Sequence, residues 1–250
     1  MDISLQNIER ALRDEEFFLE YQPIMDLGRN VCVGAEALIR WRLESEVLLP
    51  DLFIHLVEKT PLSGPLTYWV VETVAKELGD WIRNTGHASI HINVPPEILG
   101  RGGLYYAASK CGLLDVADKI VMEITERGVP DDLGLQALNK SKEYGMKTCL
   151  DDVGANSENL FLLTRTSVDI VKLDKSVADK MLEPDWSPNA IEGLTAFTRA
   201  TAIEVIAEGV ETEKQRDIFA EAGVRMAQGY HFSPSLSAEK FIEYFAANSG

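Results

Sequence analysis

The sequence predicts an α/β protein that folds as a TIM-like (β/α)8 barrel with one antiparallel strand. Three observations lead to this prediction: eight short apolar runs typical of strands, amphipathic stretches between most of them, and a very short turn between the first two runs. No low-complexity segment or Pro/Gly/Ser-rich linker divides the 250 residues. Since α/β barrels routinely reach about 250 residues as one unit, we expect a single domain over residues 1–250.

The predicted strands are short apolar runs that recur along the whole chain. Their length and composition are typical of buried or half-buried strands. They cover residues 17–24, 31–41, 88–94, 119–125, 147–153, 168–174, 204–210 and 225–232.

The predicted helices are amphipathic stretches between these runs, at 65–84, 132–144, 188–201 and 212–222. Thr212 and Gln215 fit a capping box at the start of the last of these, and Gly223 stands where that helix would stop. The tail at 237–250 has the pattern of a final amphipathic helix.

The first two strands are separated only by a turn through Asp26, Gly28 and Asn30. Parallel neighbours need a crossover of a dozen or more residues, so this pair is predicted to be antiparallel. An open doubly wound sheet is the alternative architecture. It is disfavoured because no GxGxxG or Walker A pattern begins any predicted helix.

The composition is strongly acidic, with 40 Asp and Glu against 24 Lys and Arg and a formal charge of −16. This balance argues against binding a nucleic-acid polymer or an anionic membrane surface, although a small phosphate-bearing ligand stays possible. We find no membrane segment and no signal peptide. Three cysteines without a CxxC pair suit reduced thiols, so we expect a cytoplasmic protein.

Polar residues recur near the ends of the apolar runs, where a barrel forms its active-site mouth. One acid at such a position is usually a helix cap or a solvated loop residue. Six converging acids, however, cannot all be ionised without compensating positive charge. The residues are Glu36, Asn93, Glu123, Glu126, Asp151, Asp152, Lys172, Glu208 and Gln228.

A divalent cation is the compensating charge that these side chains favour. Carboxylates together with an Asn carbonyl suit Mg²⁺ or Mn²⁺. A zinc site is disfavoured because the histidines and cysteines show no ligand spacing. His91, which alternates with Asn93, is interpreted as a structural histidine.

The sequence around these residues resembles the EAL domain family, phosphodiesterases of the bacterial second messenger cyclic di-GMP. Glu36-Ala37-Leu38, followed by Ile39-Arg40-Trp41, is similar to the motif that names the family. The resemblance extends from residue 5 to residue 245, with the family's blocks in the same order: YQPIMDL (21–27), HINV (91–94), MEITE (122–126), LDDVG (150–154), VKLDKS (171–176), AEGVE (207–211) and QGYHFS (228–233).

The resemblance implies hydrolysis of cyclic di-GMP to linear pGpG, dependent on Mg²⁺ or Mn²⁺ and with two ions expected. Two ions together can activate a water and stabilise the attacking and leaving oxygens. By position, it implies that the metal ligands are Glu36, Asn93, Glu123 and Asp151, with Asp152 serving a second ion.

Further roles are implied for residues around the metals. Lys172 would hold the nucleophilic water, and Glu208 would be tied to the metal site and that water. Asp152 and Glu208 both stay open as the general base. Substrate or phosphate contacts are implied for Gln22, Arg40 and Gln228, and support of the loop after Asp152 for Glu126.

One loop departs from the family, where DDFGTGYSSL is usual and this chain has DDVGANSENL at 151–160. We expect altered loop flexibility to change activity or regulation, neutral drift being the simpler alternative. The altered loop also keeps a second hypothesis open: a catalytically silent receptor for cyclic di-GMP or a protein-binding adaptor. A hydrolase for another phosphate ester is a third. The resemblance further implies a homodimer. Two arrangements stay open: a stand-alone EAL protein, or an excised domain regulated by a sensory domain or protein partner outside this chain.

Overall fold

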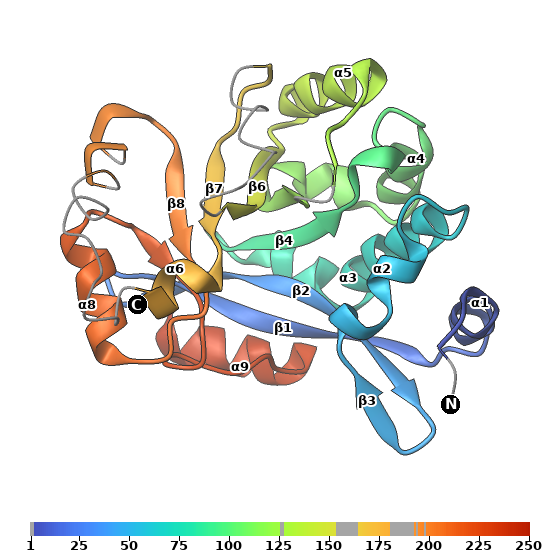
Figure 1. The fold of residues 1–250 in the computed structure, drawn as a ribbon, viewed down its shortest axis with the longest axis horizontal. Helices are drawn as coiled ribbons and strands as arrows, with labels where there is room; N and C mark the ends of the chain where they lie inside the picture. The colour runs from blue at the N-terminus through green and yellow to red at the C-terminus, as the bar shows by residue number, and fades with distance from the viewer. Residues whose placement is uncertain (1–2, 126–127, 154–164, 181–192, 194, 198) are drawn as a thin grey trace.

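The eight-stranded barrel is closed by pairing between its first two strands (Figure 1). This computed structural model describes residues 3–125, 128–153, 165–180, 193, 195–197 and 199–250. The strand order is β1-β9-β8-β7-β6-β5-β4-β2, and β3 extends the sheet beyond β2. The strands are β1 Phe17–Asp26, β2 Val31–Leu43, β3 Glu46–Leu48, β4 Ser89–Val94, β5 Ile120–Ile124, β6 Lys147–Val153, β7 Ile170–Leu173, β8 Glu204–Ala207 and β9 Met226–Ala227.

The reversed strand is β1, as the short turn predicts. It runs antiparallel to β2, with Gln22 opposite Glu36, and antiparallel to β9 on its other side. The remaining neighbours within the barrel, from β2 through β4 to β9, are parallel. The predicted barrel with one antiparallel strand is confirmed.

Several strand boundaries differ from the prediction. The run at 225–232 forms only the two-residue strand β9, because Gly229 has a positive φ and the chain turns there, with Phe232 N–H donating to the Gly229 carbonyl. Strand β8 ends at Ala207 rather than at residue 210. The three-residue hairpin strand β3 was not predicted.

Helices pack around the barrel, and α9 lies along β1 and β2 (Figure 1). The capping box at Thr212 and Gln215 is present at the start of α8. Half of the predicted helix at 188–201 lies outside the described residues. The helices α1, α2, α4 and α6 were not predicted. The helices are α1 Leu5–Arg13, α2 Ile54–Val57, α3 Ser63–Asn84, α4 Gly103–Lys110, α5 Asp132–Ser141, α6 Lys175–Lys180, α8 Glu213–Glu221 and α9 Ala238–Asn248.

The core combines the strands with aromatic side chains from both ends of the chain. Trp41 is fully buried and packs edge-on against Phe53, with ring centroids 5.6 Å apart. Phe241 of α9 stacks on Tyr21 of β1 and contacts Trp81 of α3 edge-on. These contacts fix the reversed strand between the barrel and its last helix.

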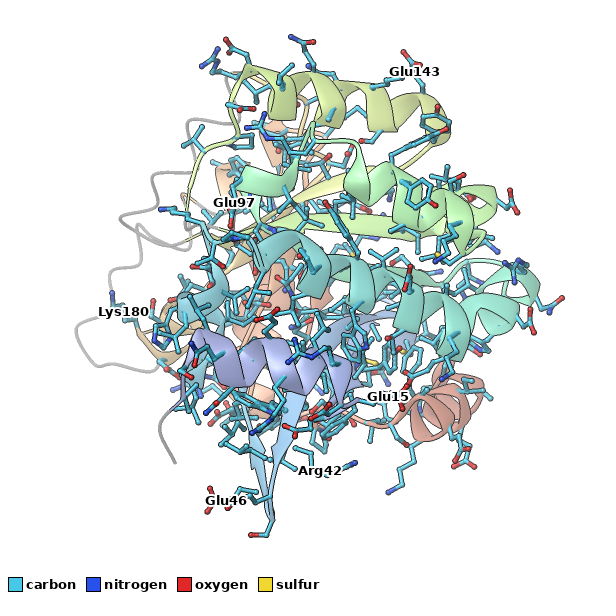
Figure 2. The ribbon with its side chains drawn as sticks, turned by 90° about the vertical axis from the view of Figure 1, so that its right-hand side faces the viewer. Glu15, Arg42, Glu46, Glu97, Glu143 and Lys180 are labelled. Atoms are coloured by element: carbon cyan, nitrogen blue, oxygen red, sulfur yellow. The ribbon has the colours of Figure 1, made fainter. Side chains whose placement is uncertain are left out.

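Other charged residues lie on the outside of the molecule, away from the centre of the barrel. Figure 2 shows Glu46 at the tip of the β2–β3 hairpin and Glu143 beyond the end of α5. Among the described residues, none of the helices has the length and apolar composition needed to cross a membrane.

Candidate active site

Four strands bring carboxylates to one buried ammonium group, that of Lys172 on β7. Its side chain is 1% exposed. Its Nζ lies 2.9 Å from Glu36 Oε2, 3.1 Å from Glu123 Oε2, 3.2 Å from Asp151 Oδ1 and 2.6 Å from Glu208 Oε1. We call these four acids, together with Asp152, the acidic cluster.

Two carboxamides complete the surroundings of Glu36. Asn93 Nδ2 donates to Glu36 Oε1 at 2.8 Å, and Gln228 Nε2 donates to Glu36 Oε2 at 2.6 Å. Gln228 Nε2 also donates to Glu208 Oε1 at 3.0 Å. Gln228 Oε1 is buried and has no hydrogen-bond partner among the described residues, so an acceptor oxygen stays available beside the cluster.

Asp151 and Asp152 lie at a bulge near the end of β6. Consecutive side chains of a regular strand point to opposite faces. Here the register with β7 shifts between Leu150 and Val153, and Asp152 has a φ of 51°, a left-handed conformation that Asp tolerates better than most residues. As a result, Asp151, Asp152 and Glu208 each offer a carboxylate oxygen within 4.8 Å of the others.

His91 on β4 supports Glu123 from outside the acidic cluster. Its Nδ1 lies 2.8 Å from Glu123 Oε1, and its Nε2 lies 3.4 Å from Ser89 Oγ. Burial, reinforced by the Lys172 ammonium, lowers the pKa of His91 to about 3, so the ring is neutral. With the proton on Nδ1, the ring donates to Glu123 and accepts from Ser89. The sequence predicted that His91 is a structural histidine, but it did not indicate that Glu123 is its partner.

Burial and mutual repulsion perturb the protonation of the cluster. Burial raises the pKa of Glu123 and that of Glu208 well above the ordinary range, and neighbouring carboxylates add to both shifts. For Glu36 the penalty of burial is outweighed by Lys172 and by the donors Gln228 and Asn93, which lower its pKa to about 2. The surrounding carboxylates raise the pKa of Lys172 well above its usual value despite burial, so Lys172 stays charged.

The donor set of the cluster fits hard divalent cations. With all five carboxylates ionised, as metal ligation requires, the cluster and its one ammonium would carry a formal charge of −4, which two divalent ions would neutralise. All of the free donors are oxygens, including the unpartnered Gln228 Oε1, and oxygen ligands suit Mg²⁺ and Mn²⁺. The chemistry of these residues therefore matches the expected metals.

Of the three predicted substrate residues, Gln22 and Arg40 lie along the β1–β2 hairpin, and Gln228 directly follows β9. Gln22 is directly opposite Glu36, so both side chains leave the same face of the sheet. Arg40 is already bound, with Nε donating to Glu20 Oε2 at 2.9 Å and one terminal nitrogen donating to Ser235 Oγ at 3.1 Å. Sequence reasoning missed this contact with Ser235. Glu126 lies outside the described residues.

A cavity of about 230 Å³ adjoins the acidic cluster. Asn93, Asp151 and Asp152 line its inner side. Leu38 of β2, Ile54 and Val57 of α2 and Val70 of α3 contribute apolar wall. The cavity thus combines oxygen ligands at its base with apolar surface above, as small-molecule sites do.

Comparison with known proteins assigns the family. The family model of the EAL domain matches residues 5–235 of this chain. The chain belongs to the EAL domain family. As an EAL domain, it is 32% identical over 95% of its length to the probable cyclic di-GMP phosphodiesterase PdeB of Escherichia coli. It is 29% identical over 97% of its length to the cyclic di-GMP phosphodiesterase NbdA of Pseudomonas aeruginosa. It spans only 46% of PdeB and 32% of NbdA.

Solved structures agree with the fold of this EAL domain. The EAL enzyme Bd1971, in its cAMP- and cyclic di-GMP-bound form, aligns with a TM-score of 0.86 at 27% identity, covering 96% of this chain and 67% of that chain. An EAL domain protein from Listeria monocytogenes aligns with a TM-score of 0.83 at 26% identity and covers 99% of both chains.

Proposed function

We propose that this EAL domain hydrolyses one phosphodiester bond of cyclic di-GMP and releases linear pGpG. The observation that supports this most is the acidic cluster around Lys172, which joins five carboxylates from β2, β5, β6 and the end of β8 beside a cavity. Relatives that share most of this chain are named as phosphodiesterases of that dinucleotide.

The proposed cofactor is a pair of Mg²⁺ or Mn²⁺ ions. Glu36, Asn93, Glu123 and Asp151 would hold the first, and Asp152 the second, with Glu208 beside both. When bound, the ions would acidify a water and stabilise charge on the attacking and leaving oxygens of the phosphate.

Lys172 is proposed to orient the attacking water by donating a hydrogen bond to it. Because the carboxylates keep Lys172 protonated, it does not take the proton of that water. That proton goes to Asp152 or Glu208, whose carboxylate oxygens lie within 4.8 Å of each other. Gln228 keeps Glu36 and Glu208 in place, since its Nε2 donates to both.

Arg40 and Gln22 are proposed to contact the substrate. The bonds to Glu20, to the Ile39 carbonyl and to Ser235 use Nε–H and one hydrogen on each terminal nitrogen of Arg40. A second hydrogen on each terminal nitrogen stays available for a phosphate oxygen, and Arg can donate both at once.

Purified protein incubated with Mn²⁺ and cyclic di-GMP tests the proposed activity. We expect pGpG to accumulate on anion-exchange chromatography, and cyclic di-AMP to serve as the control nucleotide. Tight binding of cyclic di-GMP with no pGpG after hours would overturn the enzyme and favour the alternative, a receptor or adaptor. The altered loop is the sequence feature that favours this alternative, and residues 154–160 lie outside the described residues.

Removal of metal is expected to weaken substrate binding. Without cations the cluster carries excess negative charge and repels the two phosphates of cyclic di-GMP, whereas bound cations attract them. We expect the affinity for a non-hydrolysable phosphorothioate analogue to fall at least about tenfold in EDTA, a loss of roughly 1.4 kcal/mol. Isothermal titration in Mg²⁺ and in EDTA measures this. Equal affinity in both buffers would contradict a metal-dependent site.

Replacement of His91 is expected to weaken metal binding by releasing Glu123. A histidine that hydrogen-bonds a metal ligand from behind typically accounts for about 10–100-fold in metal affinity. We expect His91→Phe to lower the affinity for Mn²⁺ by this factor. His91→Asn should keep much of the affinity, because its amide can donate in place of Nδ1–H. Titration of Mn²⁺ by electron paramagnetic resonance measures both variants. Equal Mn²⁺ affinities of the two variants would argue against this role.

We also propose a cytoplasmic location, a homodimer and one domain over residues 1–250, with a sensory domain or protein partner as its regulator. Light scattering of the purified chain tests the dimer.

A further inference from the structure

A larger cavity, of about 460 Å³, lies between the barrel and helices α3, α4 and α5. Its wall is almost wholly apolar, and the strands β4 and β5 form its floor. Residues of the floor, of α4 and of α5 include Ile92, Met122, Leu104, Tyr105, Ala137 and Lys140. Its volume is in the range of sites that bind small molecules.

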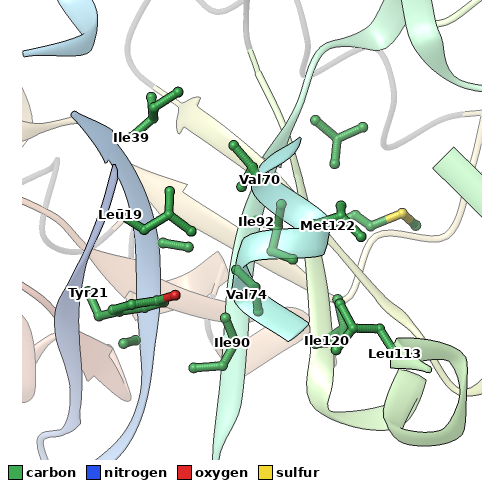
Figure 3. Close-up of a cluster of buried hydrophobic side chains, with 14 of the residues drawn as sticks. Leu19, Tyr21, Ile39, Val70, Val74, Ile90, Ile92, Leu113, Ile120 and Met122 are labelled. Carbon is green, nitrogen blue, oxygen red and sulfur yellow. The ribbon is translucent and has the colours of Figure 1, made fainter. Parts of the chain in front are cut away.

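This cavity is on the opposite side of β4 and β5 from the acidic cluster. Ile92 pairs with Met122 in the sheet, and the next pair is Asn93 with Glu123. Because successive side chains alternate between faces, Ile92 and Met122 point outward where Asn93 and Glu123 point into the barrel. Figure 3 shows the side chains of Ile92 and Met122 next to one another on the outer face. The two sites therefore share two strands but no wall.

The apolar lining indicates an apolar occupant. Covering apolar surface with an apolar ligand removes that surface from water, which is favourable in proportion to the area covered. Ordered waters need two to four polar partners each, which the Ile, Leu and Met lining does not supply. An aliphatic chain would fill the space without leaving polar groups unpaired.

The polar groups that line the cavity indicate the head group of that occupant. Lys140 is exposed on the last turn of α5, and the described residues hold no ion-pair partner for it. Ser141 is next to it, and the rings of Tyr105 and Tyr144 lie 5.9 Å apart on the same cavity. The Ser141 hydroxyl already donates to the Leu138 carbonyl at 2.8 Å. The remaining cation and two tyrosine hydroxyls suit a carboxylate better than an amine.

We propose that this cavity binds one single-chain fatty acid, with its chain over Ile92 and Met122 and its carboxylate at Lys140. This site is independent of the proposed hydrolysis, since it shares no residue with the acidic cluster. The probe for testing it is dodecanoate, used below its micellar concentration in the absence of cyclic di-GMP.

Methyl NMR of the unaltered protein gives the first test. We expect saturable shifts at one dodecanoate per chain in the methyl groups of Ile92, Ile98 and Ile120, with those of Ile8 and Ile206 unchanged. Absence of saturable shifts at the three cavity residues, or equal shifts at all five, would overturn the site.

Two matched variants on α5 give the second test. Ala137→Trp fills the cavity and should weaken dodecanoate binding at least tenfold, whereas Gln136→Trp, on the exposed face of the same helix, should not.

Lys140→Glu tests the carboxylate. It should weaken dodecanoate binding at least tenfold but leave the affinity for 1-dodecanol unchanged. Unaltered dodecanoate affinity in Ala137→Trp would overturn the cavity, and unaltered affinity in Lys140→Glu would overturn the carboxylate. Should Ala137→Trp fail to fold, the methyl shifts of the unaltered protein decide.

Discussion

Lys172→Met is expected to slow hydrolysis by at least about 10²-fold and to destabilise the metal-free protein. The variant loses the donor that orients the attacking water, and loss of one such preorganised donor lowers kcat by about 10²–10³-fold. It also removes the ammonium group that lies within 3.2 Å of four buried carboxylates. Breaking a buried ionic cluster from one side costs about 3–5 kcal/mol of the free energy of unfolding. Product formation and urea unfolding in EDTA measure the two effects.

Lys175→Met is the matched control, three residues further along the chain. Among the described residues, Lys175 forms one ion pair, with Glu211 at the surface, where its side chain is 53% exposed, and surface pairs contribute about 0–1 kcal/mol. We expect little change in activity or stability there. Divalent ions should recover part of the stability of Lys172→Met but not its activity. A Lys172→Met protein that turns over cyclic di-GMP at the unaltered rate would refute the proposed role.

Glu36→Ala is expected to abolish turnover by removing a metal ligand. The truncation also leaves Asn93 Nδ2 and Gln228 Nε2 without the carboxylate that accepts from both. We expect Mn²⁺ affinity to fall by about 100-fold or more, as ligand loss exceeds the effect of losing a supporting residue. Mn²⁺ titration and pGpG formation are the measurements.

Two further variants separate charge from coordination at this position. Glu36→Gln keeps the size of the side chain and can still accept from Asn93, but it lacks the charge, so we expect it to remain inactive. Glu46→Ala removes an exposed acid at the tip of the β2–β3 hairpin and should leave activity unchanged. Turnover retained in Glu36→Ala would show that the acidic cluster is not the site of hydrolysis.

The sequence was sufficient to predict the barrel, its reversed strand and the convergence of acids at its centre. The reversed strand follows from a turn of a few residues, which is local information. The acids interrupt apolar runs that are typical of buried strands, so the sequence pattern already indicated that their side chains are buried. By contrast, the two-residue strand β9 depends on how Gly229 turns against Val210, which no periodicity records.

Contacts between distant residues were beyond the sequence for a different reason. The pairing of His91 with Glu123 depends on β4 lying beside β5 in one particular register. The contact of Arg40 with Ser235 joins residues 195 positions apart. Such contacts depend on how neighbouring strands are aligned in the folded barrel. That alignment is determined by packing between residues far apart in the sequence, which a single sequence does not reveal. The bulge that turns Asp152 toward Asp151 has the same origin.

The short strand β9 decides where this barrel opens. It is held by two residue pairs on each side, whereas β1 and β2 share ten. We therefore expect local fluctuations that leave the rest of the sheet intact to begin at this seam, and amide hydrogens near Met226 to exchange with solvent before those of the neighbouring ladders. Gln228 follows β9 directly, so each opening also releases the amide that bridges Glu36 and Glu208. We therefore expect local opening of β9 and loss of the Gln228 contacts with Glu36 and Glu208 to occur together.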